Sequence, residues 1–325
     1  MTAKDDLAPP PRSLVALSTM WAMQPRFERD LPAFMARAAE LGFDAIEVNH
    51  SMDASQAGAI LGTAAVHGEG VPRVTGVHAP APLERHPGRG ENRGLNLAST
   101  DEEERSIAVG YHLRSIELAE QAGASVVVVH LGGIGSRLLD GERRLRSLYE
   151  RRDRVPEEWG EAVDATVRER AAQAAPWLEA ARASLEEMAR EASMRGVTLG
   201  IETRLHYHEI PLPQELAALL APYPADVAGY LHDTGHAEVH HRLGVIDRSA
   251  WWDLLGRRLV GLHLHDVRGL TDHRAPGNGD VDFHWLADRI REANPMAART
   301  FEVDQHESDE DLAAGLRLLR DAGVV

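Results

Sequence analysis

The chain has 325 residues, of which 43% are hydrophobic and 26% charged, with a formal net charge of −16 and no cysteine. This composition is ordinary for a globular protein, excludes disulfides and thiolate-bound metal, and argues against a nucleic-acid partner, which needs basic groups facing the phosphates. No apolar run approaches the roughly 18 residues of a membrane span, so we expect no contact with a membrane. We also expect a cytoplasmic protein that acts on a small molecule. Homo-oligomerisation is left open. At the N-terminus, residues 1–13 are polar and proline-rich and are expected to form a flexible leader.

Short β-rich runs alternate with longer helical patterns along the rest of the chain. The expected strands are residues 14–18, 44–48, 73–78, 125–131, 197–202, 227–232, 259–265 and 299–303. The expected helices are residues 30–41, 54–66, 100–123, 174–195, 213–220, 251–257, 284–293 and 308–323. Residues 79–96 and 267–282 contain Gly and Pro and are expected to form loops.

This alternation predicts a single catalytic domain over residues 14–325, folded as a (β/α)8 TIM barrel of the α/β class. The charged segment from about residue 133 to 175, after the fourth strand, is expected to form a helical insertion over the barrel mouth. A doubly wound open sheet is the structural alternative. It would carry a glycine-rich turn after the first strand, and Thr19–Ala22 is not such a turn.

Polar residues gather where the expected strands end, and in a parallel barrel these ends form the mouth in which catalytic groups lie. Six strands end in or are followed by His, Asp or Glu: His78, His130, Glu202, His232 with Asp233 and His236, His263 with His265, and Glu302. A lone residue of this kind is usually structural. Several carboxylates in one mouth, however, are costly unless a cation neutralises them, which predicts a divalent metal. Oxygen-rich donors favour Mn2+, Mg2+ or Co2+, while the additional histidines favour Zn2+ or a second metal.

Eight short motifs accompany these strand ends. They are GVHAP at residues 76–80, LNLAS at 95–99, VHLGG at 129–133, LGIETR at 199–204, HDTGH at 232–236, LHLHD at 262–266, PGNG at 276–279 and FEV at 301–303. In this order they resemble the motifs of the xylose isomerase-like TIM barrel superfamily, which contains sugar isomerases and epimerases, inosose dehydratases and endonuclease IV. Each motif is weak alone, and together they are specific for the superfamily but not for one activity.

The resemblance implies a shared metal site formed by Glu202, Asp233, His263 and Glu302. His236 would lie beside this site and contact the substrate or a second metal. Members similar to endonuclease IV hold three metals (Zn, Mn or Fe), and their additional ligands match His78, His130, His236 and His273. Their further aspartate falls at Thr271, with Asp272 as its neighbour, and this departure puts the third metal in question.

The leading hypothesis is an isomerase or epimerase that acts on a sugar or a sugar-like polyol or keto compound. One metal polarises the substrate carbonyl and stabilises an enediolate, while Glu202 and Glu302 exchange a carbon-bound proton, with His236 as a third catalytic residue. The residues expected to contact the substrate are Trp21 after the first strand, Arg204, His206 and His208 after the fifth strand, and His265 and Arg268 after the seventh.

The alternative is a multinuclear metallohydrolase, similar to endonuclease IV, that cleaves a small phosphodiester rather than DNA. His78, His130 and His273 favour this hypothesis, and the acidic net charge disfavours a DNA substrate. Lyase or dehydratase chemistry and an inactive binding protein are further alternatives. Clusters of unused buried charge destabilise a fold, which counts against an inactive protein.

Overall fold

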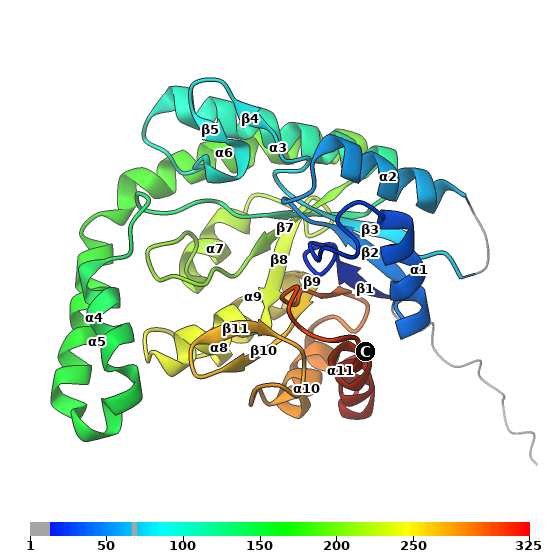
Figure 1. Ribbon diagram of the computed structural model, residues 1–325. Helices are drawn as coiled ribbons and strands as arrows, with labels where there is room; N and C mark the ends of the chain where they lie inside the picture. The colour runs from blue at the N-terminus through cyan, green and yellow to red at the C-terminus, as the bar shows by residue number, and fades with distance from the viewer. Residues whose placement is uncertain (1–13, 67–69) are drawn as a thin grey trace, which may run out of the picture.

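Eight parallel strands close into a barrel in the order β1-β12-β9-β8-β7-β6-β3-β2. Figure 1 shows this barrel at the centre of the molecule. The structure is a computed structural model that describes residues 14–66 and 70–325, so the expected leader at residues 1–13 lies outside the described residues. The barrel strands are β1 (Val15–Ser18), β2 (Ala45–Val48), β3 (Arg73–His78), β6 (Val126–Val129), β7 (Thr198–Glu202), β8 (Ala228–Asp233), β9 (Leu259–Leu264) and β12 (Ala298–Phe301). The predicted (β/α)8 TIM barrel is confirmed.

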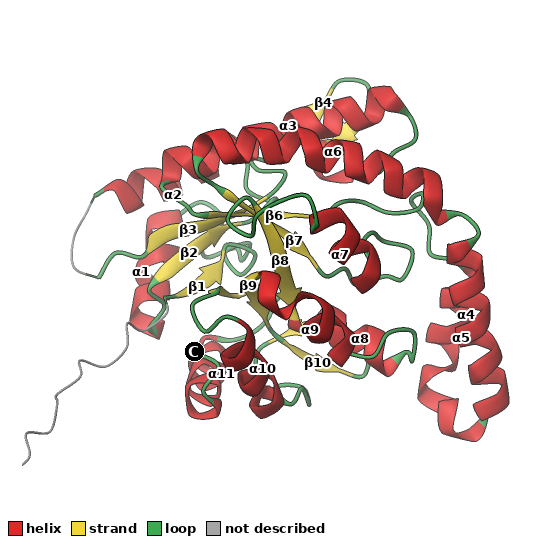
Figure 2. Ribbon diagram, turned by 180° about the vertical axis from the view of Figure 1, so that it is seen from behind, coloured by secondary structure: helices red, strands yellow, loops and turns green. Residues whose placement is uncertain are grey.

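Most of the helices form a layer around the outside of these strands (Figure 2). The helices of the described residues are α1 (Leu31–Leu41), α2 (Ala54–Ala65), α3 (Glu102–Ala122), α4 (Asp140–Leu148), α5 (Pro156–Ala171), α6 (Ala174–Arg195), α7 (Pro213–Leu220), α8 (Thr234–Arg242), α9 (Ser249–Leu255), α10 (Phe283–Ala293) and α11 (Asp309–Ala322). Short 3-10 turns are η1 (Asn92–Gly94), η2 (Tyr149–Arg154) and η3 (Gly256–Arg258). Within the described ranges 14–66 and 70–325, no helix combines the length and apolar character required to cross a membrane.

The inner face of the barrel changes from apolar to polar along the strands. Val126, Val128 and Leu231 pack together as a separate buried cluster, and a Cβ on Gly200 of β7 would lie 3.1 Å from a methyl group of Leu231. Successive side chains on a strand face opposite sides, so every second residue points inward. Two residues beyond Leu231, the same inner face therefore carries Asp233. The apolar cluster closes the barrel beneath a layer of polar side chains.

Elements that the sequence did not reveal lie close to the polar end of the barrel. Helix α8 begins directly after β8, where Asp233 accepts a hydrogen bond from the His236 N–H at 2.7 Å. Its first seven residues are all buried and include polar ones such as His236 and Glu238, so they show no division into an apolar buried face and a polar exposed face that could have indicated the helix. The expected loops also contain two hairpins, of β4 (Arg85–His86) with β5 (Gly90–Glu91) and of β10 (Asp266–Arg268) with β11 (Thr271–Arg274).

The insertion after the fourth barrel strand is helical, as expected, but it stands beside the mouth. Helices α4 and α5 form an arm at one edge of the molecule in both ribbon views (Figures 1 and 2). The arm packs on the segment after β7: Arg146 donates to the Leu205 carbonyl at 3.1 Å and Arg170 to the Tyr207 carbonyl at 2.7 Å. The arm therefore holds a loop of the mouth in place from the outside.

Candidate metal centre

At the polar end of the barrel, three carboxylates converge on one ring nitrogen of a fourth side chain, Nδ1 of His263. This atom lies 2.8 Å from Glu302 Oε2, 3.4 Å from Glu202 Oε1 and 3.7 Å from Asp233 Oδ2. All four side chains are buried. They come from the ends of β7, β8, β9 and β12, so the barrel brings together residues that are up to 100 positions apart in sequence. These are the four residues that the sequence analysis predicts as the shared metal site.

The unsatisfied atoms at this point fit a metal cation. Glu202 Oε1 and His263 Nδ1 are buried and have no hydrogen-bond partner among the described residues. A buried acceptor without a partner costs free energy, and a cation would satisfy both atoms at once. Three carboxylates and one imidazole are suitable ligands for Mn2+, Co2+, Mg2+ or Zn2+. Glu202, His263 and Glu302 belong to one group of mutually close donors, and Asp233 belongs to a neighbouring group, with its Oδ2 3.7 Å from His263 Nδ1. The four side chains could together hold one divalent cation.

The negative charge of the carboxylates in this cluster is balanced by protons on the neighbouring histidines. Burial lowers the pKa of His263, but Glu302, Glu47 and Glu202 raise it well above its usual value. Burial raises the pKa of Glu202, but His130 and His263 lower it well below its usual value. The cluster thus keeps its carboxylates ionised by means of positive charge on histidine, which is the charge that a bound cation would supply instead.

A first outer group of histidines approaches the other oxygen of Glu202. His130 Nε2 lies 2.6 Å and His78 Nε2 lies 3.4 Å from Glu202 Oε2. His130 Nε2 also contacts the guanidinium of Arg204. One ring nitrogen cannot both accept from a guanidinium and donate to a carboxylate, so this contact is incompletely satisfied. His78, His130 and Glu202 are therefore placed where a second cation could bind.

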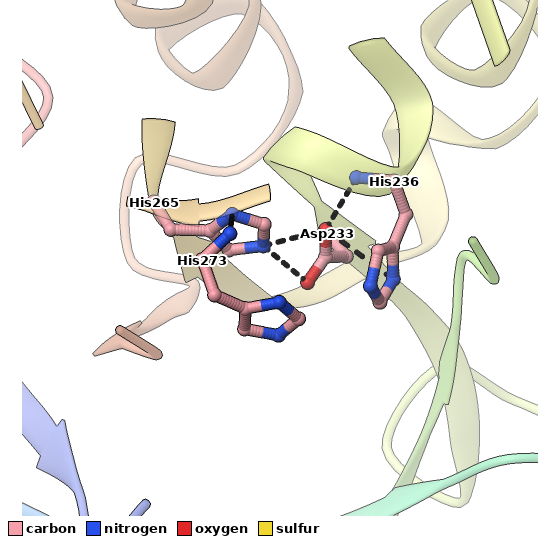
Figure 3. Close-up of side chains that lie close together, drawn as sticks. All are labelled: Asp233, His236, His265 and His273. Carbon is pink, nitrogen blue, oxygen red and sulfur yellow. Dashed lines mark hydrogen bonds and ion pairs between the residues drawn. The ribbon is translucent and has the colours of Figure 1, made fainter. Parts of the chain in front are cut away.

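A second group of histidines, His236, His265 and His273, lies around Asp233 (Figure 3). Asp272 Oδ2 lies 3.4 Å from His236 Nε2 and 3.1 Å from His273 Nδ1, and it has no hydrogen bond among the described residues. Burial lowers the pKa of His273, but Asp272 and Glu302 raise it to about 10. Although Thr271 stands where the resemblance places an aspartate, the Asp272 carboxylate lies between the two histidines.

His265 holds Asp233 and has no nitrogen left for a ligand. Its Nδ1 accepts the His273 backbone N–H at 2.9 Å, and its Nε2 lies 2.9 and 3.0 Å from the two oxygens of Asp233 (Figure 3). The first bond requires a lone pair on Nδ1, so the Nε2–H donates to Asp233. The ring is fully buried. His265 is thus a support of Asp233, which corrects its assignment as a substrate-binding residue.

The polar end of the barrel opens into a cavity of about 260 Å3. Two of the four proposed metal ligands, Glu202 and Glu302, line it. The histidines around them also belong to the lining, namely His78, His130, His236 and His273. Arg204 and His206 line it as expected, together with Leu205 and Glu209 from the same loop. The volume lies below the range of roughly 300–1,000 Å3 that is typical for drug-sized ligands, so the cavity suits a small molecule.

Three further residues expected to bind substrate lie elsewhere. Trp21 is fully buried, donates from Nε1 to the Glu307 carbonyl at 2.9 Å and packs against Phe27, so its ring is not available to a substrate. His208 is buried, and its ring stacks on that of His206. Arg268 is exposed on the β10–β11 hairpin. None of the three belongs to the described cavity lining.

The second strand also contributes to the cavity, which was not predicted from the sequence. Asn49, His50 and Ser51 line the cavity after β2, and His50 Nδ1 lies 3.3 Å from His78 Nδ1. Met20 lines it after β1, next to the Trp21 that was predicted instead. The available signal for β2 was the spacing of Glu47 and Asn49, two polar residues on the same inward face of a strand that is otherwise apolar.

Arg204 is neutralised where it enters the cavity. Its Nε and Nη2 donate to Glu209 Oε1 at 3.1 and 2.9 Å. Burial raises the pKa of Glu209, but Arg204 and the His206 N–H lower it to about 2 from the usual 4.5. Among the described residues lining the cavity, Arg204 is the single Arg or Lys. The cavity therefore offers no unpaired cationic side chain.

We expect this ion pair to contribute to the free energy of unfolding, and the contribution should depend on pH. Because the pKa of Glu209 is lowered on folding, its stabilisation is present above pH 4.5 and is lost as pH falls towards 2. We expect Glu209→Gln to be destabilised by roughly 3 kcal/mol at pH 7, corresponding to a shift of about two pKa units or somewhat more. Urea unfolding from pH 7 to pH 2 should show the difference from wild type shrinking below pH 4.5. A difference that is constant over this range would contradict the ionised pair.

Comparisons with known proteins agree with this architecture. A family model described as xylose isomerase-like TIM barrel matches residues 35–322. None of the curated proteins matches the chain. Among solved structures, a D-tagatose 3-epimerase-like protein is 17% identical with a TM-score of 0.66, covering 95% of this chain and 96% of that chain. An L-ribulose 3-epimerase is 16% identical with a TM-score of 0.66, covering 96% and 95%. A Thermus thermophilus protein described as soaked with ZnCl2 is 21% identical with a TM-score of 0.57, covering 95% and 97%. At these identities the structural likeness shows the fold.

Proposed function

Because the chain belongs to the xylose isomerase-like TIM barrel family, we propose that it is a divalent-metal-dependent isomerase or epimerase acting on a neutral sugar or a sugar-like polyol or keto compound. The observation that carries the proposal is the convergence of Glu202, Asp233 and Glu302 on His263 Nδ1 next to a small cavity. The epimerase names of similar structures support the same class of reaction.

Two carboxylates are placed to move the carbon-bound proton. Glu202 and Glu302 both line the cavity, and the pKa of each is held well below its usual value against the effect of burial, so both are ionised and able to accept a proton. A divalent cation, when bound, would polarise the substrate carbonyl and stabilise the negative charge that develops as the proton leaves. His236 lines the cavity and donates from Nδ1 to the Thr203 carbonyl at 2.8 Å, and its Nε2 lies 3.4 Å from Asp272 Oδ2, so Nε2 is the nitrogen that could act on a substrate.

The charge of the cavity supports a neutral substrate. Arg204 is already paired with Glu209, and Arg268, the other arginine expected to contact the substrate, is exposed outside the lining. A phosphate group would bring further negative charge next to Glu202 and Glu302 without an unpaired cationic side chain to receive it. Small neutral molecules that offer neighbouring oxygens to a cation, as ketoses do, avoid this cost.

The decisive experiment is isotope exchange combined with a metal count. Protein purified without chelator is expected to contain about one Mn or Co per chain and to exchange one carbon-bound hydrogen of a neutral ketose or aldose with solvent deuterium, as followed by NMR over a panel of sugars. No exchange with any sugar of a broad panel, together with cleavage of a phosphodiester, would show that the proposal is wrong.

A second candidate function, a multinuclear hydrolase of a small phosphodiester, is favoured by the outer histidines. His78 and His130 lie at Glu202, and Asp272 lies between His236 and His273, so ligands for additional cations are present. Two or three cations would supply the positive charge that the cavity lacks and could activate a hydroxide. Close to three Zn or Fe per chain, with hydrolysis of a chromogenic phosphodiester, is the result that this candidate requires.

A further inference from the structure

Glu47 is a buried carboxylate that the proposed reaction does not use. It is the third residue of β2, is 3% exposed, and points inward at the level of the metal centre. Its Oε1 and Oε2 lie 3.1 and 3.4 Å from His263 Nε2, the ring nitrogen on the side away from Glu202, Asp233 and Glu302. His263 therefore lies between the proposed metal ligands at Nδ1 and a carboxylate at Nε2.

The surroundings of Glu47 fix the position of its carboxylate. Thr300 on β12 donates its hydroxyl to Oε2 at 3.1 Å. On the neighbouring strand β3, Gly76 pairs with Glu47, and a Cβ at Gly76 would lie 2.9 Å from Oε2. A larger residue at position 76 would therefore displace the carboxylate. Two strands thus provide a hydroxyl and an open space that hold Glu47 against His263.

We propose that Glu47 is a positioning residue for the metal centre, which rests on the metal-dependent function proposed above. Neutral imidazole carries its proton on one nitrogen only, and that nitrogen is selected by the hydrogen bond it makes. By accepting from the Nε2–H of His263, Glu47 fixes the tautomer that directs the Nδ1 lone pair towards Glu202, Asp233 and Glu302. It also fixes the ring plane.

The alternative role for Glu47 is purely structural, as one more buried polar group in the barrel. The two roles predict different effects on metal affinity. A structural residue contributes equally to the metal-free and metal-loaded protein, so that its loss lowers stability without changing metal affinity. A positioning residue changes the affinity, because a misdirected imidazole is a poorer ligand. Supports of this kind typically contribute about 10–100-fold to metal affinity.

The test is the affinity of the full-length protein for Co2+, measured by competition with a chromophoric chelator at constant pH. Glu47→Gln keeps the shape of the side chain but removes its charge, and we expect Co2+ to bind about 10–100-fold more weakly, with an altered visible spectrum of the bound Co2+. Glu238→Gln is the matched control: Glu238 is also a buried carboxylate, but it pairs with Arg242 and Arg248. This control should bind Co2+ like the wild type.

Unchanged affinity and an unchanged Co2+ spectrum in folded Glu47→Gln would overturn the proposal. If Glu47→Gln does not fold, Thr300→Val, which removes the hydroxyl bond to Oε2, carries the test with a few-fold weakening expected and unchanged affinity as the contrary result. Failure of the proposed function has a different signature. In that case the wild type binds no Co2+, or Glu202→Gln binds it as tightly as the wild type.

Discussion

Glu202→Gln is expected to lose the bound metal and to lower turnover by a factor on the order of 10²–10⁴, the usual contribution of a general acid–base group. The two oxygens of Glu202 have separate partners: Oε1 lies 3.4 Å from His263 Nδ1, and Oε2 lies 2.6 Å from His130 Nε2. The amide removes the negative charge and turns one acceptor into a donor. Both the attraction for a cation and the capacity to take a proton are therefore lost. Elemental analysis and deuterium exchange into a ketose measure the two effects.

A matched control for this variant is Glu209→Gln. Glu209 also lines the cavity, but its carboxylate pairs with Arg204 and it is outside the four converging ligands. We expect this control to retain wild-type metal content. Circular dichroism should show that Glu202→Gln is folded. Full metal occupancy in folded Glu202→Gln would contradict the ligand assignment.

Removal of the metal is expected to lower the melting temperature, and the loss should grow with pH. A ligand present at 100 to 1,000 times its Kd stabilises a protein by about 2.7–4.1 kcal/mol. At about 2 °C per kcal/mol for a large domain, the melting temperature should fall by about 5–8 °C. Chelator treatment followed by thermal unfolding with and without added Mn2+ measures the difference.

The direction of the pH effect follows from the histidines of the cluster. The pKa of His273 is raised on folding to about 10, and that of His263 is also raised. The stabilisation of the metal-free protein by these protons is complete below their unfolded pKa of about 6.5 and is lost as pH rises towards 10. Metal binding replaces the proton on His263 Nδ1, so its stabilising effect should be larger at pH 9 than at pH 6.5. A gap between metal-loaded and metal-free protein that narrows as pH rises would refute this description, and Glu202→Gln should show no gap.

The barrel and the convergence of the four proposed ligand side chains could be predicted because both depend on strand periodicity. A strand fixes the direction of its side chains, so Glu202 at the end of β7 and His263 in β9 must point into the mouth of a parallel barrel. The order of the strands places them together regardless of the loops between them. The same regularity explains why β3 was predicted with its observed bounds, Arg73–His78.

The loops carry no such period, and there the prediction was less accurate. After β1 the chain turns, so that Met20 faces the cavity and Trp21 packs against Phe27 in the core. A shift of one residue in a turn thus exchanges a cavity-lining position for a core position, and the sequence does not show where the turn begins. Arg268 was misplaced for a similar reason, since the hairpin that contains it depends on tertiary pairing with β11.

Residues that act through others were also difficult to recognise. His265 has the type and spacing of a ligand, and only the three-dimensional contacts show that the His273 backbone occupies one of its nitrogens. Glu47 ends no visible motif, and its partner His263 lies 216 residues away. Such supporting contacts are defined by the packing of distant strands and leave little pattern in the local sequence.

Substitutions at Asp233 should be tolerated less well than substitutions in the loops that line the cavity. Its carboxylate accepts from the first turn of α8 at the His236 N–H, accepts from His265, and faces His263 Nδ1. A one-carbon extension to Glu would have to preserve a helix cap, a histidine contact and a ligand geometry simultaneously. The segments 49–51 and 204–206 line the cavity from loops. Engineering of substrate preference should therefore begin with these loops and leave position 233 unchanged, because at that position the proposed metal centre and the start of a helix depend on the same two oxygen atoms.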